Sequence, residues 1–285
     1  MSPASANASP RRRWRTGPAW TGLQVALSAS LLLLFLLPLY ALFTYAPPSE
    51  IGAAAGDPAV RAALWLTFYA SGIAVLASVV FAIPLGYLLA RRTFPGHSVV
   101  EAIVTLPVVV PHLLVGLGLF LLLAPGSPLF FSVYDTLYGV IFVMVFVSAP
   151  YTVLASELAF RAVDTRILEA SRSLGAGPAT SFLTVSFPIA LRGIIGGLLL
   201  SWARAVSEIG GILILAYTVY PSGLYNGPTT STISVLVYNL FQNGNLRYAA
   251  AVSSFFLLIA FVLFTAIRVA ERSGWLPWGR GELTP

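Results

Sequence analysis

Two ionisable side chains of opposite charge lie within one apolar stretch of the chain. Arg204 and Glu208 occur in the segment SWARAVSEIGGILILAY. Their spacing places them one turn apart on a helix, where they can form an ion pair. Charges surrounded by apolar sequence are costly and usually face a pore or the interior of a bundle. Two interpretations remain open: a structural ion pair between neighbouring helices, or an arginine on an anion pathway or its gate.

Two further polar residues belong to the same candidate gate. Ser207 precedes Glu208, and His112 follows Pro111 in a second apolar stretch, LPVVVPHLLVGL. We predict that His112 bonds to a backbone carbonyl group, with a place beside a substrate as the alternative. The sequence has no Cys and two His, so neither disulfides nor a thiolate or imidazole metal site is expected. No Ser/His or paired-Asp arrangement indicates an intramembrane enzyme.

A polar segment, RAVDTRILEASRSLGAGPATSFLTVSFPIALRG, separates two apolar stretches. Asp164 or Thr165 can cap a short helix at its start. Gly175 can adopt the left-handed conformation that ends such a helix, and Gly177 with Pro178 can begin a second one. The pattern therefore predicts two short helices joined by a sharp corner.

The apolar residues of the first short helix are Ile167, Leu168 and Leu174, and their spacing predicts that they share one face. From the residues alone, the segment is either an interfacial linker or a docking surface.

Composition indicates an integral membrane protein. Of 285 residues, 58% are hydrophobic and 9% are charged, whereas soluble domains carry about 25% charged residues. The mean hydropathy is +0.86. The net charge of +6 comes from arginines near the ends of apolar runs, which is typical of topology determinants and argues against a nucleic-acid partner.

Six apolar stretches are long enough to cross a bilayer as helices, so we predict an all-α, polytopic transmembrane helix bundle. The first stretch is too long for the apolar part of a signal peptide, and no small-x-small cleavage site follows it, so we expect an uncleaved span. The predicted spans are 22–46, 62–90, 99–124, 138–160, 189–217 and 249–269.

Arginine placement predicts that both termini are cytoplasmic. Thirteen arginines fall on one side of the predicted bundle and two, Arg61 and Arg247, on the other. The predicted organisation is an Arg-rich arm (1–21), a transmembrane domain (22–270) with a cytoplasmic segment at about 161–188, and a cytoplasmic tail (271–285). In the long outer loop, STISVLVYNLF is expected to form a helix against the bundle, with a re-entrant segment as the alternative. The thirteen arginines predicted to lie on the cytoplasmic side are Arg11, Arg12, Arg13, Arg15, Arg91, Arg92, Arg161, Arg166, Arg172, Arg192, Arg268, Arg272 and Arg280.

The stretch EASRSLGAGPATSFLTVSFP resembles the EAA loop of ABC importer permeases. Glu169, Ala170, Gly175 and Pro188 match that pattern, and Ser171 replaces its second alanine. The resemblance implies a type I ABC importer permease in the prokaryotic plasma membrane, whose short cytoplasmic helix docks on a separate ATP-binding subunit.

The resemblance also implies roles for individual residues of this coupling segment. Glu169 would orient the docking helix or meet basic groups, Leu168 and Leu174 would supply apolar contacts, and Arg172 lies among them. The sequence has no lysine and therefore no Gly-x4-Gly-Lys-Ser/Thr loop, so this chain is not expected to be the ATPase. No cofactor is expected in it, and ATP and Mg would bind to the partner subunit.

Three stretches resemble the permeases for molybdate, tungstate and sulfate, with the greatest likeness to the tungstate/molybdate group. They are the segment around Arg204, LPVVVPHLLVGL and GDPAVRAALWLTFYA, and the likeness covers roughly residues 57–217. The likeness implies an oxyanion delivered by an external binding protein to a homodimer of this chain with two ATP-binding subunits. Another solute (sulfate, phosphate, a sugar or an amino acid) remains an alternative. A secondary transporter is disfavoured, because Glu208 is the one clear buried carboxylate and no internal repeat is visible.

Overall fold

The computed structural model describes residues 18–127, 131–220 and 229–272, and this part of the chain is α-helical apart from one isolated antiparallel bridge between Val219 and Thr230. The elements are α1 (Pro18–Tyr45), α2 (Pro48–Gly56), α3 (Pro58–Arg91), α4 (His97–Val109), α5 (His112–Leu123), α6 (Leu137–Arg161), α7 (Thr165–Ser173), α8 (Pro178–Ser181), the π-helical turn η1 (Phe182–Ser186), α9 (Phe187–Val206), α10 (Gly210–Leu215), α11 (Ile233–Gln242) and α12 (Leu246–Arg272).

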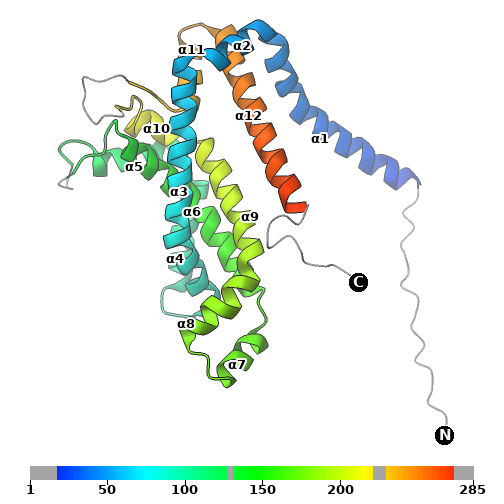
Figure 1. Ribbon diagram of the computed structural model, residues 1–285, viewed down its shortest axis with the longest axis vertical. Helices are drawn as coiled ribbons and strands as arrows, with labels where there is room; N and C mark the ends of the chain where they lie inside the picture. Colours follow the sequence, from blue (N-terminus) through cyan, green and yellow to red (C-terminus); the bar gives the residue numbers. More distant parts are fainter. Residues whose placement is uncertain (1–17, 128–130, 221–228, 273–285) are drawn as a thin grey trace.

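Within the described residues, five helices are long and apolar enough to cross a membrane: α1, α3, α6, the continuous run α8–η1–α9, and α12. The pair α4 and α5 forms a sixth, broken span, bent by 111°. The all-α bundle of about six spans is therefore confirmed. Figure 1 places α2 and α11 at one end of the molecule and α7 with α8 at the other.

The arginine asymmetry lies along this axis. Arg91 and Arg161 end α3 and α6 at the α7 end, whereas Arg61 and Arg247 begin α3 and α12 at the opposite end. Which end faces the cytoplasm stays a prediction. The arginines of the amino-terminal arm and Arg280 lie outside the described residues.

Two of the predicted spans were wrong in outline. The third was expected as one helix over 99–124, but it breaks at Val110, which is extended (φ −71°, ψ 135°). The cause is Pro111, which has no N–H and disfavours helical geometry in the residue before it.

The fifth span was expected over 189–217, but its helix runs from Pro178 to Val206. It begins eleven residues earlier than expected, because Pro178 opens a helix at its first turn. The Ser- and Thr-rich stretch that follows contains a π-turn, in which the Phe187 N–H bonds to the Phe182 carbonyl. The helix stops at Val206, and α10 follows after a short break.

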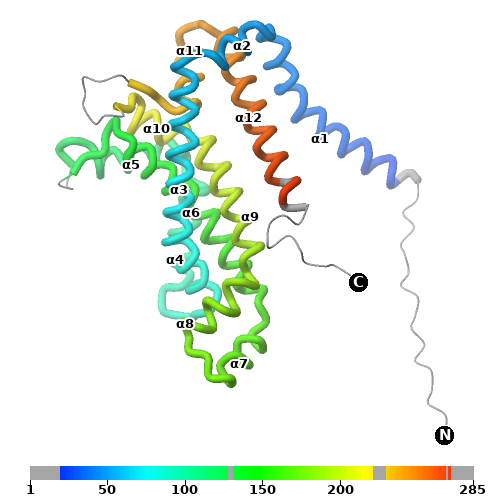
Figure 2. Tube along the Cα trace, in the orientation of Figure 1, coloured from blue at the N-terminus to red at the C-terminus, as the bar shows by residue number. Residues whose placement is uncertain are grey.

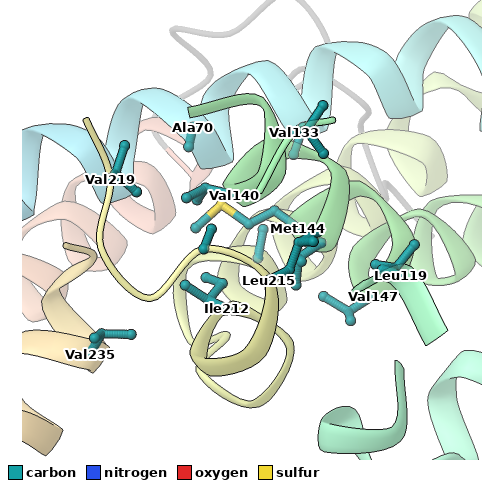
Figure 3. Packing of buried hydrophobic residues seen from close by; sticks show 14 of the residues in the cluster. Ala70, Leu119, Val133, Val140, Met144, Val147, Ile212, Leu215, Val219 and Val235 are labelled. Atoms are coloured by element: carbon teal, nitrogen blue, oxygen red, sulfur yellow. The ribbon is translucent and has the colours of Figure 1, made fainter. Parts of the chain in front are cut away.

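The main core forms around α6, where Val140, Val143, Met144 and Val147 are fully buried. These side chains pack with residues of α5 and α10, among them Leu119, Ile212 and Leu215 (Figure 3). Between membrane spans such side chains stabilise the bundle by van der Waals packing, because lipid is as apolar as the core. The core therefore fixes α5 and α10, the two short helices that follow the breaks, against the centre of the bundle.

The outermost elements pack on α12. Helix α1 contacts α12 and diverges from the rest of the bundle, and its apolar span has no buried residue (Figure 2). Helix α11 packs through Ile233, Leu236 and Leu240 against α3 and α12. The expected helix against the bundle is thus present, the re-entrant alternative stays open, and residues 221–228 lie outside the described residues.

Candidate functional site

The short helix α7 begins and ends as its sequence predicts. The Asp164 carboxylate accepts a hydrogen bond of 2.9 Å from the Arg166 N–H and caps the helix. At the other end, Gly175 has φ +89°. Its N–H bonds to the Arg172 carbonyl (2.9 Å), and the Ala176 N–H bonds to the Ser171 carbonyl (3.1 Å). These two bonds form a Schellman motif, which fixes the corner between α7 and α8.

Two contacts hold this corner to the bundle. The Ser171 and Ser181 hydroxyl groups are hydrogen-bonded at 2.8 Å, which joins α7 to α8. Leu168 is buried in a cluster with Phe160 of α6 and Ile194 of α9. A force applied to α7 therefore reaches α6 and α9 through packed side chains.

The expectation that Ile167, Leu168 and Leu174 share one face was wrong. Leu168 points into the bundle, whereas Ile167 is half-exposed and Leu174 is 90% exposed. Glu169, Ala170 and Arg172 are exposed as well. Four exposed residues, Glu169, Ala170, Arg172 and Leu174, form what we call the coupling surface. Leu168 lies beneath this surface and supports it.

The predicted ion pair between Arg204 and Glu208 is present. Arg204 Nη2 lies 2.6 Å from Glu208 Oε2, and Arg204 Nη1 donates to the Ser207 hydroxyl at 3.3 Å. Glu208 is 1% exposed although it lies beyond the end of α9. Its second oxygen, Oε1, accepts a 2.7 Å hydrogen bond from the Gly211 N–H at the start of α10.

His112 joins this pair rather than a backbone carbonyl, which corrects the prediction for it. Its Nε2 lies 2.6 Å from Arg204 Nη2, and its Nδ1 lies 3.9 Å from Glu208 Oε2. Since an arginine nitrogen only donates, Nε2 accepts and the hydrogen is on Nδ1. His112 and Arg204 are 92 residues apart in the chain, so no local sequence signal could reveal this contact. We call His112, Arg204, Ser207 and Glu208 the charge cluster.

The charge cluster lies where two interrupted helices meet. His112 begins α5 just after the break at Pro111, and Glu208 lies in the break between α9 and α10. The two short helices approach closely at glycines: a Cβ atom on Gly116 would lie 2.7 Å from the Gly211 Cα. Glycine at these positions therefore permits the backbone contact that brings the two breaks together.

The arrangement holds one cationic group in place while leaving part of it available. Arginine has five N–H donors, and Ser207, His112 and Glu208 occupy three of those of Arg204. Arg204 is partly exposed and Ser207 is exposed. Two N–H groups remain for a further acceptor, which suits an anion better than a cation. No group of three metal-ligating His, Asp or Glu side chains occurs in 18–127, 131–220 or 229–272.

Residues 82–273 match the family described as binding-protein-dependent transport system inner membrane component. The chain is 36% identical over 212 residues to the molybdate/tungstate transport system permease protein WtpB of Thermococcus kodakarensis, covering 74% of this chain and 79% of the relative. It is 33% identical over 196 residues to the molybdenum transport system permease protein ModB of Escherichia coli, covering 65% and 81%.

Among solved structures, a bacterial alginate ABC transporter, crystallised with its alginate pentasaccharide-bound periplasmic protein, has a similar fold. The TM-score is 0.67 at 18% identity, covering 89% of this chain and 94% of that one. The fold is that of a type I ABC importer permease.

Proposed function

The chain belongs to the family of binding-protein-dependent transport system inner membrane components, and from this premise we propose that its cargo is a tetrahedral oxyanion, molybdate or tungstate. A member of this family is a multi-pass permease of an ABC importer in the prokaryotic plasma membrane, and partner subunits hydrolyse ATP. The names of the relatives support the cargo. So does Arg204, which is fixed by three hydrogen bonds within the bundle and retains two unused donors.

Arg204 has the chemistry that a transient oxyanion contact requires. Hydrogen bonds from a guanidinium group to an oxyanion are charge-assisted and therefore strong. Both Nη2 hydrogens of Arg204 are bonded within the charge cluster, so Nε and the second Nη1 hydrogen would each donate a single bond to the anion. Glu208 lies at 2.6 Å and balances the positive charge, so an anion passing Arg204 is held weakly enough to leave again. We place Arg204 and Ser207 on the path, with Glu208 and His112 as the residues that position the guanidinium.

The coupling surface is proposed to dock on an ATP-binding subunit. Leu174 offers an exposed apolar side chain, and Glu169 and Arg172 offer charges of both signs beside it. Because Gly175 and Leu168 fix α7 to the bundle, closure of two ATP-binding subunits would move α7 as a rigid element. Glu169→Lys is expected to leave membrane insertion unchanged and to uncouple ATP hydrolysis from uptake. Normal uptake by this variant would contradict the docking assignment.

We propose an assembly of two copies of this chain, two ATP-binding subunits and one external binding protein. ATP and Mg would then bind to the partner subunits, with no catalytic residue in this chain. Both termini would be cytoplasmic, so the coupling surface and the ATP-binding subunits lie on the same side of the membrane.

The cargo is tested by calorimetry on the cognate binding protein with tungstate, molybdate and sulfate. We expect tight binding of the first two, and binding of sulfate alone would move the cargo to that anion. Uptake of the bound anion is then measured in proteoliposomes that hold the full complex. A binding protein that takes up none of the three anions would contradict the oxyanion proposal.

A further inference from the structure

A second concentration of arginines lies at the α7 end of the molecule, whereas the charge cluster lies at the other end of α9. A polar cavity of about 300 Å³ opens between the end of α3 and the helix α7. Its polar lining consists of Tyr87 and Arg91 of α3, Arg92 directly after this helix, and Thr165, Glu169 and Arg172 of α7. Three arginines face one carboxylate, so the lining carries a net charge of about +2.

Two of the three arginines of this cavity, the exposed Arg92 and Arg172, have side chains that form no hydrogen bond or ion pair in the part of the chain that the structure describes. Arg91 is held in place because its Nη2 donates to the carbonyls of Phe160 (2.6 Å) and Val163 (2.8 Å). Its Nε is buried and has no hydrogen-bond partner.

The surroundings indicate where such an anion would come from. On α3, the exposed apolar side chains of Phe81 and Leu88 precede Arg91 and Arg92, so the cavity lies where the apolar surface of the helix ends. Tyr87 lines the cavity at the same level and packs edge-on against Phe160 and Phe182, which fixes the inner wall of the cavity. Basic pockets between helices at this level suit phosphate-bearing head groups.

We propose that this cavity binds a phosphate group, carried by an anionic phospholipid or free in solution. The guanidinium groups of Arg92 and Arg172 match the oxygens of a phosphate, and they belong to two different helices. A bound phosphate would therefore bridge α3 and α7 and stabilise the position of the coupling surface. The proposal is independent of the transported solute.

The lipid source is tested with the full-length chain in phosphatidylcholine nanodiscs into which phosphatidylglycerol is titrated. Retained phosphatidylglycerol is counted by native mass spectrometry. Arg92→Gln is the test variant, because Arg172 also belongs to the coupling surface. Arg166→Gln is the matched control, since it removes the same charge from an exposed position on α7 outside the cavity. We expect about fivefold weaker retention for R92Q and no change for R166Q.

The free source is tested in a phosphate-free maltoside detergent by the shift in Tm that inorganic phosphate produces. A shift in the wild-type chain that R92Q lacks assigns the site to free phosphate, and a lipid effect without this shift assigns it to phospholipid. Arg92→Lys keeps the charge and should retain most lipid binding, which guards against an effect of misfolding. Equal binding by wild type and R92Q in both arms, or an equal loss in R92Q and R166Q, would overturn the proposal.

Discussion

The ion pair of the charge cluster gives a prediction whose size follows from burial. Arg204→Gln removes the cation that faces the Glu208 carboxylate, which is 1% exposed. In the variant this carboxylate keeps one strong hydrogen-bond donor, the Gly211 N–H. Breaking a buried pair on one side costs about 3–5 kcal/mol. For a chain of this size that is on the order of 10 °C in Tm. The measurement is thermal unfolding of the purified full-length chain in detergent, followed by size-exclusion chromatography with fluorescence detection.

The double variant R204Q/E208Q separates structure from transport. It removes both charges, so most of the lost Tm should return, because a neutral replacement of a buried pair is often close to neutral for stability. If Arg204 lies on the anion path, molybdate uptake in proteoliposomes stays low although the protein is stable. Uptake that returns together with stability would leave the pair with a structural role alone.

A matched control comes from the exposed ion pair between the start of α12 and α2. Arg247 pairs with Glu50 at 3.8 Å and is largely exposed, so Arg247→Gln should cost less than about 1 kcal/mol. If R204Q lowers Tm no more than R247Q does, the argument from the buried charge is refuted.

Three further outcomes are expected. Gly175→Val forces a branched residue into φ +89° and should cost about 1–2 kcal/mol of folding free energy at the corner, which lowers uptake per ATP hydrolysed. Gly175→Asn should be tolerated, because asparagine adopts the left-handed conformation more readily. Equal uptake per ATP in both variants would refute the role of the corner. Gly116→Ala places a Cβ atom 2.7 Å from the Gly211 Cα and should lower the free energy of unfolding by about 1–3 kcal/mol. Gly118→Ala is the control, because its Cβ atom meets nothing within 4 Å. Similar Tm values for the two variants would contradict this packing. The Tyr248 hydroxyl donates a 2.5 Å hydrogen bond to the Asp57 carboxylate and is the main cause that lowers the Asp57 pKa below 3.8. The stability that this bond gives to the folded state is therefore present above pH 3.8 and is lost as pH falls through the lowered pKa. Tyr248→Phe should therefore cost about 1 kcal/mol at neutral pH and less in acid, and a Tm difference that does not change with pH would contradict this.

Features encoded by neighbouring residues could be predicted from the sequence. The cap at Asp164 and the left-handed Gly175 depend on hydrogen bonds to residues a few positions away, so their residue types suffice. The ion pair of Arg204 and Glu208 was predictable for the same reason, because one turn of chain separates them. The number and approximate positions of the membrane spans were predictable from six apolar stretches, because the thickness of a bilayer sets the length that a spanning helix needs.

Features that depend on the whole fold could not be predicted. His112 meets Arg204 only because α5 and α10 are packed together by the core around α6. The end of α9 at Val206 was missed because the apolar pattern continues into α10, while the buried Glu208 carboxylate takes the Gly211 N–H beyond the break. The inward direction of Leu168 likewise follows from the cluster that receives it.

The run from Pro178 to Val206 is a single rod that starts at the corner after α7 and ends at the charge cluster. Its 29 residues span about 43 Å at a rise of 1.5 Å per residue. A tilt of about 5° imposed at one end of such a lever displaces the other end by about 4 Å, which exceeds the length of a hydrogen bond. A small rotation at the corner would therefore be enough to separate Arg204 from His112. One continuous helix thus connects the proposed docking surface at α7 with the proposed anion contact at Arg204.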